Sequence, residues 1–311
     1  MIKLLGSLLV FLGKYASYTL PAGVFLGLAV PSLAAYLKPF LLPALLIPLT
    51  MSLVRIETSE LIQSFRNWRI IILLIVWVLI VCPVLVWAVL LLFNLPESIT
   101  MAAIIAAAAP PVTAAAAVAV FLRINAAIAV VITVATMLLV PLTLPLVLKY
   151  LVHLDVSVEL WVLSLRLSAF IFTAFILATI IKKWLGAARI HQSSSLIDGI
   201  SVVFIGVFTI GIMNGVADLF QQNPTFVLKT LLVSTLLVLG LYFVSSIVFW
   251  RLGASSAMAI GVSSGNCNLG LMYLVLANQA PLELLIFFGI GQIPLYSLPT
   301  LLSPLVAKLN K

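Results

Sequence analysis

The chain has 311 residues, of which 64% are hydrophobic and only 8% are charged. Soluble domains carry about 45–50% apolar and about 25% charged residues, so this composition excludes a soluble globular protein. At about 20 apolar residues for each crossing, the chain accommodates about ten transmembrane helices. The net charge of +8 is typical of membrane topology rather than of a nucleic-acid partner. We therefore expect an all-α polytopic membrane protein surrounded by the lipid bilayer.

Long apolar runs separated by charged or turn residues predict ten membrane-spanning helices. The first five cover about Ser17–Leu37, Phe40–Val54, Arg69–Phe93, Ser98–Leu122 and Ala126–Tyr150. The second five cover about Val158–Leu185, Leu196–Phe220, Phe226–Trp250, Ala254–Ala277 and Leu282–Leu309. No linker or second domain interrupts this series, so we expect a single transmembrane domain over residues 1–311.

The basic residues divide unequally between the two sides of this ten-helix arrangement. Twelve of the 16 Lys and Arg fall on the side of both termini, and four fall on the other side. Because Lys and Arg accumulate in cytoplasmic loops, both termini are predicted to be cytoplasmic. An even number of crossings agrees with this, and we expect the protein in the inner membrane of a bacterium.

Two of the predicted helices are interrupted near their middles. The fourth contains Ala109-Pro110-Pro111-Val112-Thr113, where two prolines remove backbone donors and clash with the preceding turn. The ninth contains Ser263-Ser264-Gly265-Asn266-Cys267-Asn268, the most polar cluster in any predicted span. Interruptions at corresponding positions of two halves indicate the binding site of a transporter. A proline kink in an otherwise packed helix is the alternative for the fourth helix.

The positions of the two breaks predict an internal repeat. Gly265 follows Pro111 by 154 positions, which is close to half of the 311 residues. Two halves of five helices each have opposite orientations in the membrane, because five is odd. We therefore expect an inverted-topology repeat, with repeat one over about residues 1–155 and repeat two over about residues 156–311.

Further segments accompany the two breaks in a recognisable order. Thr50-Met51-Ser52-Leu53-Val54 is followed by Ser59-Glu60-Leu61, and Pro83 lies in the third predicted helix. With Ala109–Ala114 and Gly265–Leu271, these segments resemble the bile acid:sodium symporter family, within the bile/arsenite/riboflavin transporter superfamily. In that family the two breaks read Cys-Pro-Gly-Gly-Thr-Ala and Gly-Met-Gln-Asn-Ser-Gly-Leu. The resemblance extends over most of the chain.

The resemblance implies a particular ten-helix architecture. Helices one, two, six and seven would form a panel, and the remainder would form a core in which broken helices four and nine cross. Substrate would bind in the cleft between panel and core, with access alternating as the bundles move. The resemblance also implies two sodium ions behind the crossing.

The sequence departs from the family at the positions of its sodium ligands. Most of these positions carry side chains without the family's oxygen atoms, and Thr133 is retained. The positions are Val78, Ala115, Ala116, Ala129, Thr133, Ser263 and Cys267. A cation in a low-dielectric site requires polar ligands and a balancing charge. Sodium coupling through these sites is therefore not expected, and no other cofactor or metal is indicated.

Candidate substrate-binding residues are the polar side chains within or near the breaks. They are Thr113, Ser263, Ser264, Asn266 and Asn268, with Asn214 and Gln292 on neighbouring helices. Since helix N-termini favour negative charge, we expect a small or amphipathic organic anion as the substrate. No nucleophile–base pair or acidic pair indicates an enzyme. The oligomeric state is left open.

Three alternatives accompany this hypothesis. Without family-type sodium ligands, facilitated diffusion or exchange explains the pattern as well as ion-driven uptake does. A receptor or sensor that binds without transporting would also retain the breaks. The Cys267 thiol suggests a metalloid or anion efflux carrier as the third alternative.

One acidic residue near the start of a predicted span has a local explanation. Ser195-x-x-Asp198 has the spacing of a capping box at the beginning of the seventh helix. The Asp198 carboxylate would then face the positive end of the helix dipole. We expect this structural role rather than proton coupling.

Overall fold

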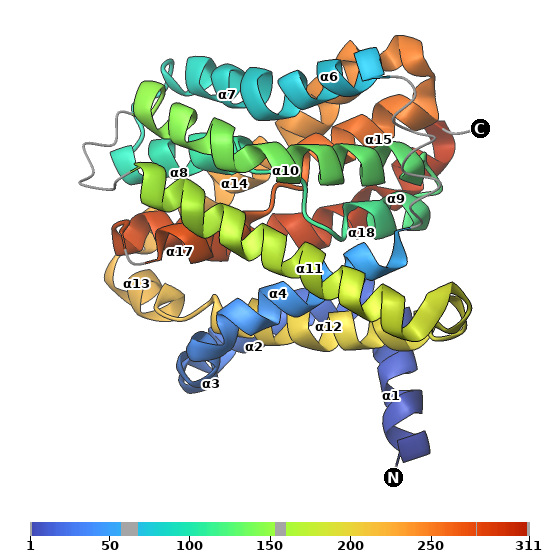
Figure 1. The fold of residues 1–311 in the computed structure, drawn as a ribbon. Helices are drawn as coiled ribbons and strands as arrows, with labels where there is room; N and C mark the ends of the chain where they lie inside the picture. The colour runs from blue at the N-terminus through green and yellow to red at the C-terminus, as the bar shows by residue number, and fades with distance from the viewer. Residues whose placement is uncertain (1, 57–67, 153–159, 278, 310–311) are drawn as a thin grey trace. The chain divides into compact units, whose positions relative to one another are not determined.

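A computed structural model describes residues 2–56, 68–152, 160–277 and 279–309 (Figure 1). The all-helical prediction is confirmed, because these residues form helices and no strand beyond one isolated β-bridge. The chain divides into two compact units. Unit 1 comprises Met1–Glu57 and Ala169–Pro224, and unit 2 comprises Thr58–Ser168 and Thr225–Lys311. Each unit therefore combines a segment from each half of the chain.

Unit 1 is organised around a central helix, α12, which packs against α1, α2, α3 and α4. The helices are α1 (Ile2–Lys14), α2 (Ala16–Ala29), α3 (Pro31–Leu37), α4 (Leu41–Arg55), α12 (Ser194–Gly211) and α13 (Val216–Gln222). Helix α11 (Leu160–Gln192) begins in unit 2, continues into unit 1 and is kinked at Gly186, whose φ is 74°. Glycine tolerates this positive φ without the Cβ strain that another residue would have.

Unit 2 contains the remaining helices, and its core includes the two interrupted ones. Its first part has α6 (Trp68–Val76), a π-helical turn (Trp77–Val81), α7 (Cys82–Leu90), α8 (Glu97–Ala107), α9 (Ala115–Phe121) and α10 (Ala126–Tyr150). Its second part has α14 (Pro224–Val248), α15 (Ala254–Gly265), α16 (Leu269–Leu276), α17 (Leu282–Ile290) and α18 (Gln292–Leu309). Helix α10 packs against α9 and α15, and α8 packs against α7 and α17.

Seven helices in the described part of the chain are long and apolar enough to cross a membrane. They are Pro31–Arg55, Trp68–Leu90, Ala126–Tyr150, Leu160–Gln192, Ser194–Gln222, Pro224–Val248 and Leu282–Lys308. The fifth predicted span agrees residue for residue with α10. The other three predicted spans are divided, at Val30 between α2 and α3 and at the two mid-helix breaks. The ten-helix count and the inverted repeat stay predictions.

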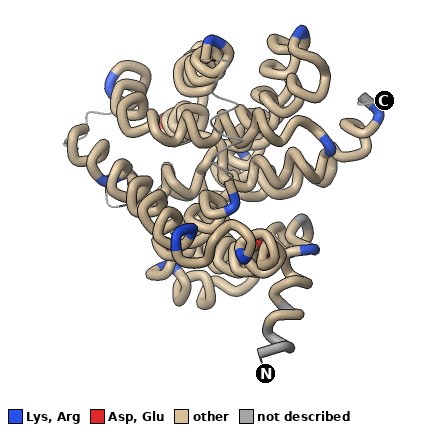
Figure 2. Tube along the Cα trace, turned by 45° about the vertical axis from the view of Figure 1, so that its right-hand side comes forward, with Lys and Arg blue, Asp and Glu red and all other residues tan. Residues whose placement is uncertain are grey.

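Charged residues are sparse along the trace, and most of them lie near the ends of helices (Figure 2). The predicted capping box at Asp198 is wrong. Helix α12 begins at Ser194, and Ser193 is its N-cap without a side-chain capping bond. Asp198 instead forms an ion pair with Arg55 of α4. A local sequence pattern cannot predict a partner that lies 143 positions away in the sequence.

Helices α1 and α12 of unit 1 pack closely at Gly199. A Cβ atom there would lie 2.2 Å from the Leu9 carbonyl oxygen. We expect Gly199→Ala to lower the thermal unfolding midpoint of the purified protein by about 2–10 °C, because overpacking costs about 1–3 kcal/mol. A Cβ at Gly206, in the same helix, meets nothing within 4 Å, so Gly206→Ala is the matched control. Equal midpoints for the two variants would contradict the close packing of α1 on α12.

Candidate functional site: the crossing of two broken helices

The first break separates α8 from α9. Helix α8 ends at Ala107 with Ala108 as its C-cap, and α9 begins at Ala115 after its N-cap Ala114. Pro110 and Pro111 have no backbone N–H and cannot continue an α-helix. The fourth predicted helix is therefore broken rather than only kinked.

The second break separates α15 from α16. Its polar residues form hydrogen bonds with some of the backbone groups at the two helix ends. Asn268 is the N-cap of α16, and its Oδ1 accepts a hydrogen bond from the Leu271 N–H at 3.0 Å. The Ser264 hydroxyl donates to the Ile260 carbonyl at 2.9 Å. The Cys267 thiol donates to the Ser264 carbonyl, with 3.3 Å between sulfur and oxygen. Capping and back-bonding thus explain why Ser and Asn are tolerated at this depth.

The two breaks cross and pair with each other through their backbones. Pro111 and Cys267 form an isolated antiparallel β-bridge. The Val112 N–H donates to the Asn266 carbonyl at 2.7 Å, and the Asn268 N–H donates to the Pro110 carbonyl at 2.8 Å. Backbone groups without helical partners must be satisfied within the protein at membrane depth. The crossing provides this, so each break stabilises the other.

Two glycines of α15 allow it to pack closely against α14. A Cβ at Gly261 would lie 2.5 Å from the Tyr242 carbonyl oxygen. A Cβ at Gly265 would lie 2.2 Å from Cδ1 of the Tyr242 ring and 2.6 Å from the Val238 carbonyl oxygen. The spacing Gly261-x-x-x-Gly265 is typical of close helix packing in membranes. This spacing is the signal in the sequence that could have predicted the contact.

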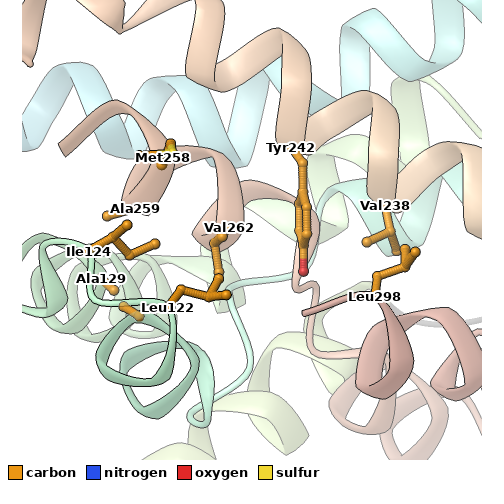
Figure 3. Close-up of a cluster of buried hydrophobic side chains, with 10 residues drawn as sticks. Leu122, Ile124, Ala129, Val238, Tyr242, Met258, Ala259, Val262 and Leu298 are labelled. Carbon is orange, nitrogen blue, oxygen red and sulfur yellow. The ribbon is translucent and has the colours of Figure 1, made fainter. Parts of the chain in front are cut away.

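Tyr242 of α14 reaches the second break from the side (Figure 3). Its hydroxyl donates a hydrogen bond to Oδ1 of Asn266 at 2.5 Å. Tyr242 is absent from the predicted site residues, because no motif surrounds it in the apolar sequence of α14. Its importance follows only from the tertiary contact.

A cluster of buried apolar side chains packs around Tyr242. They come from α9, α10, α14, α15 and α18 and from the α9–α10 connection. The cluster comprises Ala119, Leu122, Ile124, Ala129, Val238, Tyr242, Met258, Ala259, Val262 and Leu298 (Figure 3). In such an environment polar atoms without partners are expensive.

Two polar atoms at the second break have no hydrogen-bond partner among the described residues. They are Oγ of Ser263 and Nδ2 of Asn266, and both residues are 1% exposed. Leaving a buried donor or acceptor unsatisfied costs about 1–3 kcal/mol, and such groups are rare in folded proteins. A polar group bound at these two atoms would therefore form hydrogen bonds that the described protein residues leave unmade.

Six of the seven predicted site residues belong to unit 2. Thr113 is half-buried and follows Val112, the last residue of the paired segment. Gln292 is buried at the start of α18, where its amide donates to the Phe288 carbonyl at 3.1 Å. A Cβ at the preceding Gly291 would lie 2.5 Å from the Leu269 side chain. The junction between α17 and α18 therefore packs against the start of α16. Asn214 belongs to unit 1, whereas the crossing is built within unit 2.

The predicted sodium positions are mostly apolar and buried in the structure. Val78 in the π-helical turn, Ala115 at the start of α9 and Ala129 in α10 are at most 1% exposed. Ala116 is half-buried, and the Thr133 hydroxyl donates to the Ala129 carbonyl at 2.7 Å. Of these positions, only the Ser263 hydroxyl has no protein partner in the described chain. This donor set does not fit a buried cation, which requires several oxygen ligands and a balancing charge.

Long apolar helices and two interrupted helices joined break to break define a polytopic membrane protein of the transporter class. The comparison with protein families makes this specific. The model of the Sodium Bile acid symporter family matches residues 42–223, which is more than half of the chain. The chain belongs to this family and is a transmembrane transporter.

The matched region contains the first break and ends before the second one. It also includes Ser59-Glu60-Leu61, which lie outside the residues that the structure describes. A search of the curated proteins found no significant match.

Proposed function

We propose that this transporter carries a small or amphipathic organic anion across the inner membrane of a bacterium by alternating access, with the crossing as its substrate site. The observation that carries the proposal is the pair of unpartnered buried atoms, Ser263 Oγ and Asn266 Nδ2, at a break paired with a second break. An N–H group without a partner favours an acceptor such as a carboxylate oxygen. Family membership supports an acidic, amphipathic substrate.

An inverted repeat of two five-helix halves is part of the proposal. Each unit takes one segment from each half of the chain, as expected if each unit combines corresponding segments of two repeats. The antiparallel pairing of the breaks supports the same symmetry, because a two-fold axis relates the two strands of such a bridge.

We also propose that transport does not use the family's sodium sites. Alanine and valine side chains at Val78, Ala115, Ala116 and Ala129 supply no ligand oxygen, and the Thr133 hydroxyl bonds its own helix. Ser263 stands where the family has a carboxylate, so no local negative charge would balance a cation. Facilitated diffusion or exchange of anions is compatible with this arrangement.

Uptake into proteoliposomes tests the proposed function. We expect radiolabelled cholate, a bile acid with one carboxylate, to accumulate faster in vesicles that contain the protein than in protein-free vesicles. Unlabelled cholate inside the vesicles should increase the rate if the carrier exchanges anions. Saturable cholate binding to the purified protein without any flux would instead identify a receptor on a transporter fold.

A further inference from the structure

Helix α11 has two different sides along the part that belongs to unit 1. Ile171, Ala174 and Ala178 form the buried side, and each is at most 3% exposed. The other side has a shallow depression of about 240 Å³, lined by Phe175, Ile176, Thr179 and Ile180. The Thr179 hydroxyl donates to the Phe175 carbonyl at 2.8 Å, so its hydrogen is used within the helix. The depression therefore suits a hydrocarbon chain.

Lys183 continues the face of the depression toward the end of the helix. It follows Ile176 by seven residues and Thr179 by four, and these spacings place side chains on one face of an α-helix. Lys183 is exposed, and no ion pair in the described part of the chain includes it. The neighbouring Lys182 lies beside this face and donates to the Ile56 carbonyl at 2.6 Å. Among the described residues, Lys183 is thus a cation without a counter-ion, about one and a half turns beyond an apolar depression.

The surroundings of Lys183 are typical of the membrane–water interface. Trp184 is 89% exposed, and tryptophan is enriched where the hydrocarbon meets the lipid headgroups. The straight part of α11 ends close by at Gly186, which has φ 74° and ψ 156°. Lys183 therefore lies at the level of the lipid phosphates, whereas the depression lies at the level of the acyl chains.

Basic side chains outnumber acidic ones at this end of unit 1. Arg55 pairs with Asp198, and a Cβ at Gly13 would lie 3.4 Å from the Cβ of Asp198. Lys14 is next in the chain and therefore belongs to the same group of helix ends. In the sequence, these ends and the residues next to them carry the bases Lys14, Arg55, Lys182, Lys183 and Arg189 against the acids Glu57 and Asp198. An excess of positive charge at the interface attracts anionic lipid headgroups.

We infer that this face of α11 binds a phospholipid with an anionic headgroup. Its phosphate pairs with Lys183, and one acyl chain lies in the depression, whose centre is about 8 Å away along the helix axis. The acyl chains of one leaflet extend about 15 Å, half of the hydrocarbon thickness, so they reach the depression. A zwitterionic phospholipid fills the depression equally well but lacks the net charge that balances Lys183. This lipid site belongs to unit 1 and is independent of the proposed substrate site in unit 2.

Quenching of Trp184 fluorescence by brominated lipids tests the site. The lipids are phosphatidylglycerol and phosphatidylcholine with bromine near the headgroup end of one acyl chain, and each protein is compared with its Trp184→Phe form. We expect phosphatidylglycerol to bind beside Trp184 about fivefold more tightly than phosphatidylcholine, because one lysine near an anionic headgroup contributes that order of affinity. Lys183→Gln should bind the two lipids equally.

The matched control is an exposed lysine at the end of another helix. Lys149 lies beside the Tyr150 ring at the end of α10, and Lys149→Gln changes the net charge by the same amount. Lys149→Gln should retain the fivefold preference at Trp184. The same preference in Lys183→Gln would overturn the inference. No quenching of Trp184 by either lipid, as expected if a second copy of the chain covered this face, would overturn it too.

The unfolding midpoint in detergent distinguishes a bound lipid from a bound phosphate. Phosphatidylglycerol in the micelles should raise the wild-type midpoint by about 2 °C or more above that in phosphatidylcholine, because a ligand of the folded state stabilises it. Lys183→Gln should lose this difference, and its midpoint before lipid addition should equal that of wild type. The soluble compound sn-glycerol 3-phosphate, which carries the phosphate without acyl chains, should leave the midpoint unchanged. A rise with sn-glycerol 3-phosphate equal to that with the lipid would overturn the role of the depression.

Discussion

Gly265→Ala is expected to lower the thermal unfolding midpoint of the purified protein. The new Cβ would lie 2.2 Å from the Tyr242 ring and 2.6 Å from the Val238 carbonyl oxygen. The ring is enclosed by the apolar cluster, and the carbonyl is part of the α14 backbone, so neither can yield without moving α14. Overpacking of this kind costs about 3 kcal/mol or more, which corresponds to a fall of about 6–12 °C.

The control for this substitution lies in the neighbouring helix. A Cβ at Gly240 of α14 meets nothing within 4 Å. Gly240→Ala should therefore leave the midpoint unchanged or raise it slightly, because alanine favours the helix by up to about 1 kcal/mol. Both variants are compared with wild type in the same detergent. A Gly265→Ala protein as stable as Gly240→Ala would contradict the close contact of α15 with α14.

The double variant Asn266→Ala, Asn268→Ala is expected to lose at least about 90% of wild-type cholate uptake. Asn266→Ala removes the unpartnered N–H groups and leaves the Tyr242 hydroxyl without its acceptor. Asn268→Ala removes the cap that receives the Leu271 N–H, at a cost of about 1 kcal/mol. The first turn of α16 would then lose its N-cap hydrogen bond, next to the backbone pairing of the two breaks.

A third asparagine separates loss of a helix cap from loss of the site. Asn125 is the N-cap of α10 and accepts from the Ile128 N–H at 3.3 Å, without belonging to either break. Asn125 Nδ2 also donates to the Ser256 hydroxyl at 3.2 Å. Asn125→Ala should therefore destabilise the protein at least as much as Asn268→Ala and retain most of its uptake. If the double variant transported cholate at the wild-type rate, the crossing would not be the substrate site.

The sequence predicted the breaks because their chemistry is local. Two adjacent prolines end a helix wherever they occur, and the Ser263–Asn268 cluster is costly in lipid unless the chain there is exposed to polar partners. Pro111 pairs with Cys267 in the structure. The half-chain separation of the breaks predicts this pairing only when an inverted repeat is assumed. Single uninterrupted spans such as Ala126–Tyr150 were predictable for the same reason, since length and hydropathy define them.

Contacts between distant segments could not be predicted in this way. Asp198 has the spacing of a capping residue, but its partner is Arg55 on another helix. Tyr242 is an isolated tyrosine in an apolar helix, and only the fold places its hydroxyl on Asn266. The division of Ser17–Leu37 at Val30 was also missed, because Pro31 is a favourable first residue of a helix and the run stays apolar on both sides.

The sodium dependence of cholate uptake is the most direct measurement of how this transporter works. Initial rates are compared in proteoliposomes with an inward NaCl gradient and with equal gradients of KCl and choline chloride. Because the buried side chains at Val78, Ala115 and Ala129 offer no ligand oxygen, we predict the same rate in all three salts, above that of protein-free vesicles. A rate several-fold higher in NaCl, saturating with sodium concentration, would contradict transport by a crossing that binds the anion without a cation.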